Sequence, residues 1–295
     1  MERHLSEMTA GRIEPKRTVN YREIVNQAAL HFALIFILFL AMIPIIIMII
    51  ISFKDRVQYL LNPIGLTFPL HFKNYYSAGS VVLKPLGWTL LIAFLGITFN
   101  LFTSSMAAYA LARYKFLASK LMYYMIFGLM FIPTMVVLVP LYLWNKQLGL
   151  ANIWGLFFTY WILGHPFSVF LLTNSFRSIS EELLEAARCD GAGHTVIWSK
   201  IVLPLARPMV LALGVMQFLW IYSNDYMWQL VMVGASPAKT VSVAVAGLRQ
   251  GFVGGLTDVG TEMAGYVITS LPLIIAFLLA SKVFIRGMTA GAIKG

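Results

Sequence analysis

One short stretch of the sequence, residues 220–229, combines aromatic rings with amides and a carboxylate, and such groups could bind a hydroxylated ligand. Aromatic faces cover the C–H surfaces of sugars, while amides and carboxylates hydrogen-bond to hydroxyl groups. The residues that could line a substrate path are Trp220, Tyr222, Asn224, Asp225 and Tyr226. Helix packing and an interfacial aromatic belt are the alternative explanation. A proton relay through Asp225 is a further alternative, although a single intramembrane acid makes a poor relay.

The sequence offers little that could carry out bond chemistry. Cys189 is the one cysteine, so an intramolecular disulfide and a multi-cysteine metal site are excluded. The five histidines are far apart and never take an H-x-x-x-H spacing, so we expect no metal site. No Gly-Lys dipeptide occurs, which excludes a Walker-type phosphate loop. We therefore expect no catalytic residue and no cofactor on this chain, and any ATP would be bound by another subunit.

The composition is that of a membrane protein, with 59% apolar and 12% charged residues in a chain of 295. Soluble domains contain about 45 to 50% apolar and about 25% charged residues. Five uncharged runs approach or exceed the roughly 20 residues that a spanning helix needs, namely residues 32–51, 87–112, 121–145, 148–176 and 263–281. A sixth run, residues 208–233, carries one acid, Asp225. The sequence therefore predicts an all-α protein with six transmembrane helices.

The positive charges predict that both termini are cytoplasmic. With the N-terminus inside, 15 of the 22 Lys and Arg residues fall in inner segments, as the positive-inside rule requires. This distribution explains the net charge of +10 by topology, so we expect no nucleic-acid partner. Residues 1–28 mix five basic with four acidic side chains and are predicted to be a retained cytoplasmic arm rather than a signal peptide.

Residues 178–207 interrupt the apolar sequence with a charged stretch that contains helix breakers. Ser178 and Glu181 form a capping-box pattern, which predicts a short amphipathic helix from Glu181 to Arg188. Gly191 and Gly193 would end this helix, and a second short helix would follow before Pro204 and Pro208. The pattern predicts a helix-turn-helix elbow on the cytoplasmic face. An interfacial helix in a long loop is the alternative.

The spacing within this elbow resembles the EAA---G---------I-LP signature of permease subunits in ABC importers. The matching residues are Glu185, Ala186, Ala187, Gly191, Ile201, Leu203 and Pro204. Ala107 to Arg113, which read AAYALAR, resemble the second span of carbohydrate-importer permeases, and Pro140 to Tyr142 resemble their third-span PLY. The last ten residues, from Arg286, resemble the tail of the smaller, six-span permease of maltose-type systems. The resemblance covers about residue 30 to the end.

The resemblance implies a role for each part of the elbow. It is expected to be a coupling helix that docks into a cleft on a cytoplasmic ATPase, with Glu185 pairing to a basic residue of that partner. The small Ala186 and Ala187 would let the helix seat closely, and Gly191 would permit the tight turn. The other residues assigned to this ATPase-coupling site are Asp190, Ala192, Ile201, Leu203 and Pro204.

The resemblance also implies two further contact regions. The tail would reach the interface between two ATPase subunits through Thr289, Ala290, Gly291, Lys294 and Gly295. The segment between the fifth and sixth spans would contact an extracytoplasmic solute-binding protein through Gln250, Gly251, Phe252 and Gly255. Two positions depart from the family pattern, because Cys189 replaces an aliphatic residue and Ser180 stands where a proline is common. These departures leave open which ATPase the elbow fits.

Together these features predict a permease with the type I ABC importer fold in a bacterial inner membrane. Its domains would be a cytoplasmic arm at 1–28, a six-helix permease domain at 29–286 and a cytoplasmic tail at 287–295. The expected partners are a second, different permease, two ATPase subunits that hold ATP and Mg, a binding protein and the lipid bilayer. The expected substrate is a carbohydrate or oligosaccharide. A non-sugar solute, such as a glycerophosphodiester or a peptide, and a secondary transporter are the alternatives.

Overall fold

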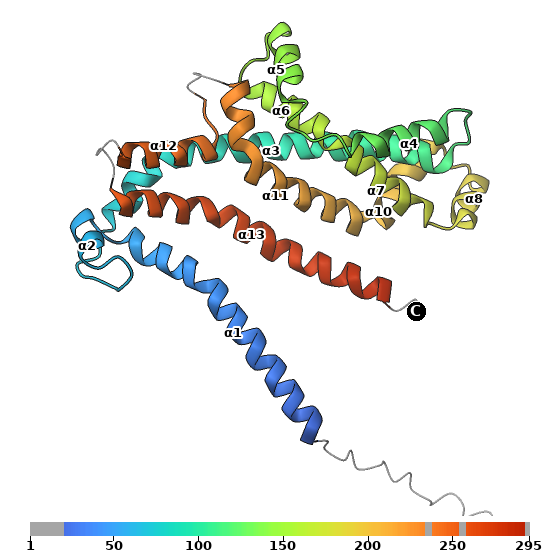
Figure 1. The fold of residues 1–295 in the computed structure, drawn as a ribbon. Helices are drawn as coiled ribbons and strands as arrows, with labels where there is room; N and C mark the ends of the chain where they lie inside the picture. The colour runs from blue at the N-terminus through green and yellow to red at the C-terminus, as the bar shows by residue number, and fades with distance from the viewer. Residues whose placement is uncertain (1–20, 234–237, 254–257, 293–295) are drawn as a thin grey trace, which may run out of the picture. The chain divides into compact units, whose positions relative to one another are not determined.

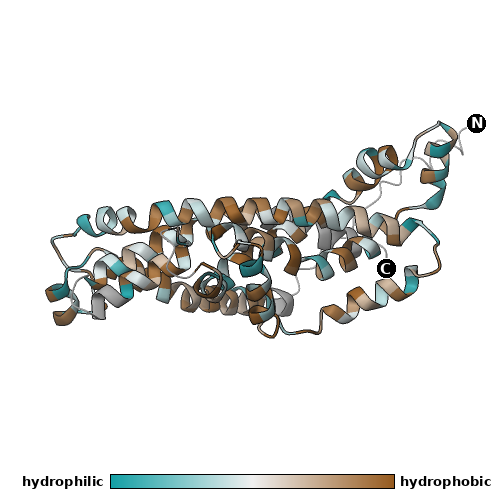
Figure 2. Ribbon diagram, turned by 90° about the horizontal axis from the view of Figure 1, so that it is seen from above, coloured by the Kyte–Doolittle hydropathy of each residue, from teal (hydrophilic) through white to brown (hydrophobic). Residues whose placement is uncertain are grey.

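The computed structural model describes the backbone of residues 21–233, 238–253 and 258–292. Throughout these residues the chain forms helices joined by turns and short connections, with no strand among them. The predicted all-α fold is therefore confirmed. Hydrophobic residues dominate the long helices, and hydrophilic residues gather at helix ends and connections (Figure 2).

The chain divides into two units, Met1–Ile47 and Met48–Gly295. The first unit contains most of α1, Tyr21–Ser52, within which the predicted first span lies. The apolar part of α1, Val25–Ser52, has 28 residues and would be about 42 Å long, which exceeds the hydrocarbon core of about 30 Å. Most of the predicted N-terminal arm at residues 1–28 lies outside the described residues.

The centre of the second unit is α3, Lys73–Arg113, which extends the predicted second span by about four turns toward its N-terminus. Around it pack α6, Ile153–Leu163; α7, His165–Arg177; α11, Arg207–Met232; α12, Val241–Val253; and α13, Val259–Ala292 (Figure 1). Small buried residues such as Ala78, Gly96, Ser104 and Ala108 line α3. Small residues let helix backbones approach closely in membranes, so α3 can contact helices on several sides.

The third predicted span is not one continuous helix. Residues 121–145 form α4, Ser119–Leu129, and α5, Leu138–Gln147, with residues 130–137 between them in turns. Hydropathy predicted this run correctly as apolar but could not show that its backbone breaks. A short α2, Arg56–Leu61, follows α1.

Among the described residues, four helices are long and apolar enough to cross a membrane. They are Val25–Ser52, Lys73–Arg113, Ile153–Arg177 and Val259–Leu279. The predicted fifth span corresponds to α11, which joins the preceding segment His194–Leu205 at a bend of 74°, and this bent pair would make a fifth span. By length and composition the predicted count of six spans is thus not reproduced, because the third is split and α11 qualifies only together with the bent segment before it.

Candidate functional site

The predicted elbow begins with α8, Glu181–Cys189, which has one buried and one exposed face. Leu184 is fully buried in a cluster with Phe176, Ile197 and Val202, whereas Glu185 is exposed. The helix was predicted correctly, but its capping box was wrong, because Ser178 ends α7 and its hydroxyl donates to the carbonyl of Ser175. The two acids in the first turn still favour the helix, since they lie at the positive end of its dipole.

The end of α8 forms a Schellman motif centred on Gly191. The amide of Ala192 donates to the carbonyl of Ala187 at 2.9 Å, and the amide of Gly191 donates to the carbonyl of Arg188 at 3.0 Å. Gly191 has a φ of +83°, in the left-handed region that favours glycine. The prediction that the backbone turns tightly at Gly191 agrees with this geometry, whereas its part in coupling to an ATPase stays a prediction.

The second arm of the elbow contains α9, His194–Val196; a π-helical turn η1, Ile197–Val202; and α10, Leu203–Leu205. Ile197 and Val202 are fully buried against α8 and α7, while Ile201 and Leu203 are half-buried around them. Pro204 is exposed at the bend before α11. The elbow therefore presents the exposed Glu185, Ala186, Asp190 and Gly191 on one compact body whose opposite side is packed into the protein core.

The five candidate path residues make different contacts in the structure, and they do not form one site. Asp225 is fully buried, and the hydroxyl of Tyr160 on α6 donates to its carboxylate. The hydroxyl of Tyr222 donates to the carbonyl of Thr269 at 2.5 Å, and the side chain of Asn224 donates to its own helix at the carbonyl of Trp220. This geometry supports a packing role for Asp225.

Trp220 lines a cavity of about 340 Å³ at the break between α6 and α7. The other lining residues are Thr134, Leu163, Gly164, Phe167, Met216 and Gln217. The amide nitrogen of Gln217 donates to Asn100 Oδ1 at 2.9 Å and to Ser168 Oγ at 2.6 Å. Its amide oxygen is buried and has no hydrogen-bond partner among the described residues. A tryptophan face beside an unused acceptor is a combination that can bind a hydroxylated ring.

Tyr222 and Tyr226 line a second, more open cavity of about 520 Å³ between α11, α12 and α13. Ser242, Arg249, Tyr266 and Thr269 also line it. Sequence reasoning missed Gln217, Asn100 and Arg249 as lining or network residues. The one available signal was the polar spacing of Asn100, Thr103 and Ser104, which places three polar side chains on one face of an otherwise apolar helix.

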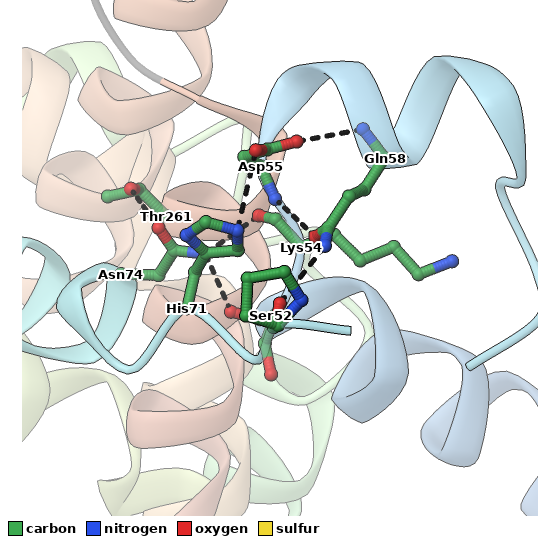
Figure 3. Close-up of polar contacts among 8 residues, drawn as sticks. Ser52, Lys54, Asp55, Gln58, His71, Asn74 and Thr261 are labelled. Carbon is green, nitrogen blue, oxygen red and sulfur yellow. Dashed lines mark hydrogen bonds and ion pairs between the residues drawn. The ribbon is translucent and has the colours of Figure 1, made fainter. Parts of the chain in front are cut away.

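A polar junction holds the start of α3 against the end of α1 and the start of α13 (Figure 3). We call residues 52–55, 71–75, 260 and 261 the α3 start junction. The side-chain amide of Asn74 donates to the carbonyls of Ser52 at 2.9 Å and Lys54 at 2.8 Å. His71 Nε2 lies 3.4 Å from the carboxylate of Asp55, which caps α2.

Lys54 and Gly260 complete this junction. Lys54 is 1% exposed, its ammonium donates to the carbonyl of Asn62, and burial lowers its pKa below the usual range. A Cβ on Gly260 would lie 2.0 Å from the carbonyl oxygen of Lys54, so the backbones of α13 and the α1 end approach as closely as a glycine permits.

Several predicted contact residues fall at the edge of the described structure. The backbone of Gln250, Gly251 and Phe252 continues α12, whereas Gly255 lies outside the described residues. In the tail, Thr289, Ala290 and Gly291 extend α13 as helical backbone, and Lys294 and Gly295 lie outside the described residues. Their proposed contacts stay predictions.

Comparison with known proteins identifies the family. Residues 100–290 match the binding-protein-dependent transport system inner membrane component family. The chain is 31% identical over 281 residues to the trehalose/maltose transport system permease protein MalG of Thermococcus litoralis, covering 92% of this chain and 99% of that protein. It is 29% identical over 272 residues to the arabinooligosaccharides transport system permease protein AraQ of Halalkalibacterium halodurans, covering 88% and 94%.

A solved structure shares the fold. A chain of a bacterial ABC transporter involved in the import of the acidic polysaccharide alginate superposes with a TM-score of 0.76, covering 89% of this chain and 98% of that chain at 21% identity. The helical architecture, the Schellman-closed elbow and the match over residues 100–290 agree with one another. The chain belongs to the family of binding-protein-dependent transport system inner membrane components.

Proposed function

We propose that this chain forms half of the translocation pore of an ABC importer for a carbohydrate or oligosaccharide. Relatives named for trehalose and maltose, arabinooligosaccharides, starch degradation products and raffinose-type sugars support this substrate class. They favour a sugar over a glycerophosphodiester or a peptide. A second permease subunit would supply the other half of the pore.

The observation that carries the proposal is the form of the elbow. Glu185 is exposed on α8, while Leu184 on the opposite face is fully buried in the cluster that joins α7, η1 and α11. An ATPase that grips the exposed face would therefore move the packed helices as well, since a close-packed core transmits displacement. In this proposal two partner ATPases hold ATP and Mg, and the chain itself performs no bond chemistry.

The substrate path in this proposal runs beside the break between α6 and α7. Trp220 would supply an apolar ring face and the free oxygen of Gln217 would accept a hydrogen bond from a sugar hydroxyl. Tyr222 and Tyr226 would line a second stretch of the path at the neighbouring cavity. Asp225, held by Tyr160, would stabilise α11 against α6 rather than touch the sugar.

The remaining partners follow from topology and from the relatives. We propose that both termini and the elbow face the cytoplasm of a bacterial cell, and that the chain lies in its inner membrane. The segment that contains α12 would face an extracytoplasmic binding protein, as the alginate transporter has been solved with a substrate-bound periplasmic protein. The α13 tail from Thr289 onward would approach the ATPases.

The decisive experiment is sugar uptake into proteoliposomes that contain the complete complex with its binding protein and ATP. We expect one sugar from a panel of mono- and oligosaccharides to stimulate ATP hydrolysis and to accumulate inside. Replacing Glu185 by Ala together with Gly191 by Ala should abolish uptake, whereas Gly193→Ala should not. Gly193 is a matched control because its φ is −73° and a Cβ there would meet no atom within 4 Å. Full uptake by the Glu185/Gly191 variant, or ATPase activity that never associates with this chain, would contradict the proposal.

A further inference from the structure

Arg113, the last residue of α3, ties this central helix to the entrance of the elbow. Its guanidinium donates to the carbonyl of Phe176, to the carbonyl of Ile179 at 2.7 Å and to the carboxylate of Glu181 at 2.8 Å. The Arg113 side chain is only 8% exposed, whereas Glu181 is 49% exposed. One buried guanidinium thus contacts the end of α7, Ile179 in the connection between α7 and α8, and the first residue of α8.

Glu181 passes this connection along α8. Its second carboxylate oxygen lies 3.0 Å from the guanidinium of Arg188, in the last turn of the same helix. Both ends of α8 are therefore tied through one carboxylate to the C-terminus of α3. Charge-assisted hydrogen bonds to a planar guanidinium fix direction as well as distance, because the donors have a rigid fork geometry.

Arg177 makes the reverse connection. It ends α7, its guanidinium lies 4.6 Å from the ring centre of Tyr123 on α4, and it is 3.5 Å from the carbonyl of Leu111 on α3. Two arginines on neighbouring helices thus each reach the backbone end of the other helix. Such a reciprocal arrangement resists both sliding and rotation of α3 against α7.

Aromatic contacts hold the second arm of the elbow to the same helix. The ring of Phe102 on α3 lies 5.8 Å from that of Trp198, and Tyr114, just beyond α3, lies 4.9 Å from His194. Both arms of the elbow are therefore fastened to the last third of α3. The ion pair of the first arm fixes the orientation of the elbow more strictly than the aromatic contacts of the second arm do, because ring contacts persist when the rings tilt.

We propose that Arg113 and Glu181 are positioning residues that transmit the movement of the elbow to α3. The inference rests on the proposed function, because it assigns a route by which an ATPase could move the transmembrane helices. Without the pair, Leu184 and its neighbours would still bury the elbow, but its angle to α3 would no longer be fixed. ATP would be hydrolysed while less sugar crosses per ATP.

The first test measures the number of ATP molecules hydrolysed per sugar transported in proteoliposomes. Arg113→Lys keeps the positive charge but loses the planar group of several donors, and Glu181→Gln keeps the shape of the side chain but loses its negative charge. We expect each to raise this number about fivefold, at the lower end of typical coupling energies. The matched control is Glu182→Gln, at the next position of α8, which is exposed. It should leave the number unchanged, and all variants should still co-purify with the ATPase.

A second test reports the angle of α8 without any transport. Cys189 is exposed at the end of α8 and is the one cysteine of the chain, so it is a ready spin-label position. Phe94→Cys provides a second, exposed position on α3. In the assembled complex the distance distribution between the two labels should broaden in Arg113→Lys and Glu181→Gln, but not in Glu182→Gln.

The two tests separate the possible failures. A wild-type complex that shows no ATP-driven uptake would overturn the proposed function. A working wild type with unchanged coupling in both variants would overturn only the role of Arg113 and Glu181. Weaker transport with unchanged coupling and an unchanged distance distribution would also overturn it, since that pattern indicates mere loss of folded protein.

Discussion

The two ends of α3 are anchored by opposite kinds of chemistry. At its C-terminus Arg113 reaches a half-exposed carboxylate, and the elbow keeps Glu185 and Asp190 on its surface. At its N-terminus the α3 start junction is held by a buried amide that donates to two backbone carbonyls and by a glycine that allows direct backbone contact. The first arrangement leaves a surface on which a partner can act, whereas the second leaves no room for adjustment. We therefore expect substitutions in the junction to affect stability and those in the elbow to affect coupling.

The sharpest test of this comparison is Gly260→Ala. The new Cβ would lie 2.0 Å from the carbonyl oxygen of Lys54 and 2.3 Å from the side-chain nitrogen of Asn74, so a backbone must shift. We expect a loss of about 3 kcal/mol in the free energy of unfolding, as overpacking against rigid groups can cause. Thermal unfolding in detergent, followed by tryptophan fluorescence, measures it. Gly247→Ala in α12 is the control, since its Cβ would meet no atom within 4 Å, and an equal effect of both would refute the argument.

The next largest effect is expected for Asn74→Asp. The substitution removes the two donated hydrogen bonds and places a carboxylate against the carbonyls of Ser52 and Lys54. We expect a loss of about 2 kcal/mol, because buried acceptors would lose their donor. Asn152→Asp is the matched control, since the Asn152 oxygen caps α6 and Asp caps equally well, and the one donated bond that it loses, to the carbonyl of Gly149 at 3.3 Å, is exposed. A comparable change in the unfolding midpoint of both variants would contradict the assigned role of Asn74.

At the other end of α3, Gly191→Ala should have a smaller effect on stability. The strain of an L-residue in the left-handed region costs about 1 kcal/mol, and no neighbouring atom crowds the position. The elbow should therefore still fold, while the fraction of complexes that couple ATP hydrolysis to uptake decreases. Comparison with Gly193→Ala isolates the backbone effect. If Gly191→Ala destabilised the protein as much as Gly260→Ala, the contrast between the two ends would fail.

The smallest expected effect concerns Lys54. Because burial lowers its pKa, the folded state binds fewer protons than the unfolded state between the lowered value and 10.5, so this group makes stability rise with pH in that window. Lys54→Met should remove that contribution. The unfolding midpoint of the wild type minus that of the variant should therefore increase as pH is raised toward 10.5 and then level off. The nearby Asp55 and His71 are common to both proteins, and a difference that stays flat with pH would exclude this account.

Local pattern predicted the parts of the structure that depend on local chemistry. Most residues of the long uncharged runs form helices, although the third run is split. Gly191 follows the end of α8 because glycine adopts a positive φ without a steric penalty. The capping box failed because Ser178 was already used to end α7, so the competing helix determined its role. Local sequence cannot show such competition when two helices lie only three residues apart.

The rest depends on contacts between distant residues. Arg113 and Glu181 are 68 positions apart, and Tyr160 and Asp225 are 65 apart, so no spacing rule could pair them. The side chains of residues 220–229 looked like one cluster, but a helix points successive residues in different directions, and the structure divides them among a cavity, a buried hydrogen bond and a second cavity. Among the five candidate path residues, Trp220, Tyr222 and Tyr226 line the two cavities described above.

The split of the third apolar run has a consequence for solvation. Residues 130–137 form turns rather than a continuous helix, so some of their amides and carbonyls lack the usual partners four residues away. Hydrocarbon cannot solvate such groups, and irregular backbone at membrane depth is stable only against protein or water. Thr134, in this segment, lines the cavity beside Trp220. In the proposed pore, the break would lie on a side of the subunit that faces away from lipid, where a hydrated passage or the second permease would cover it.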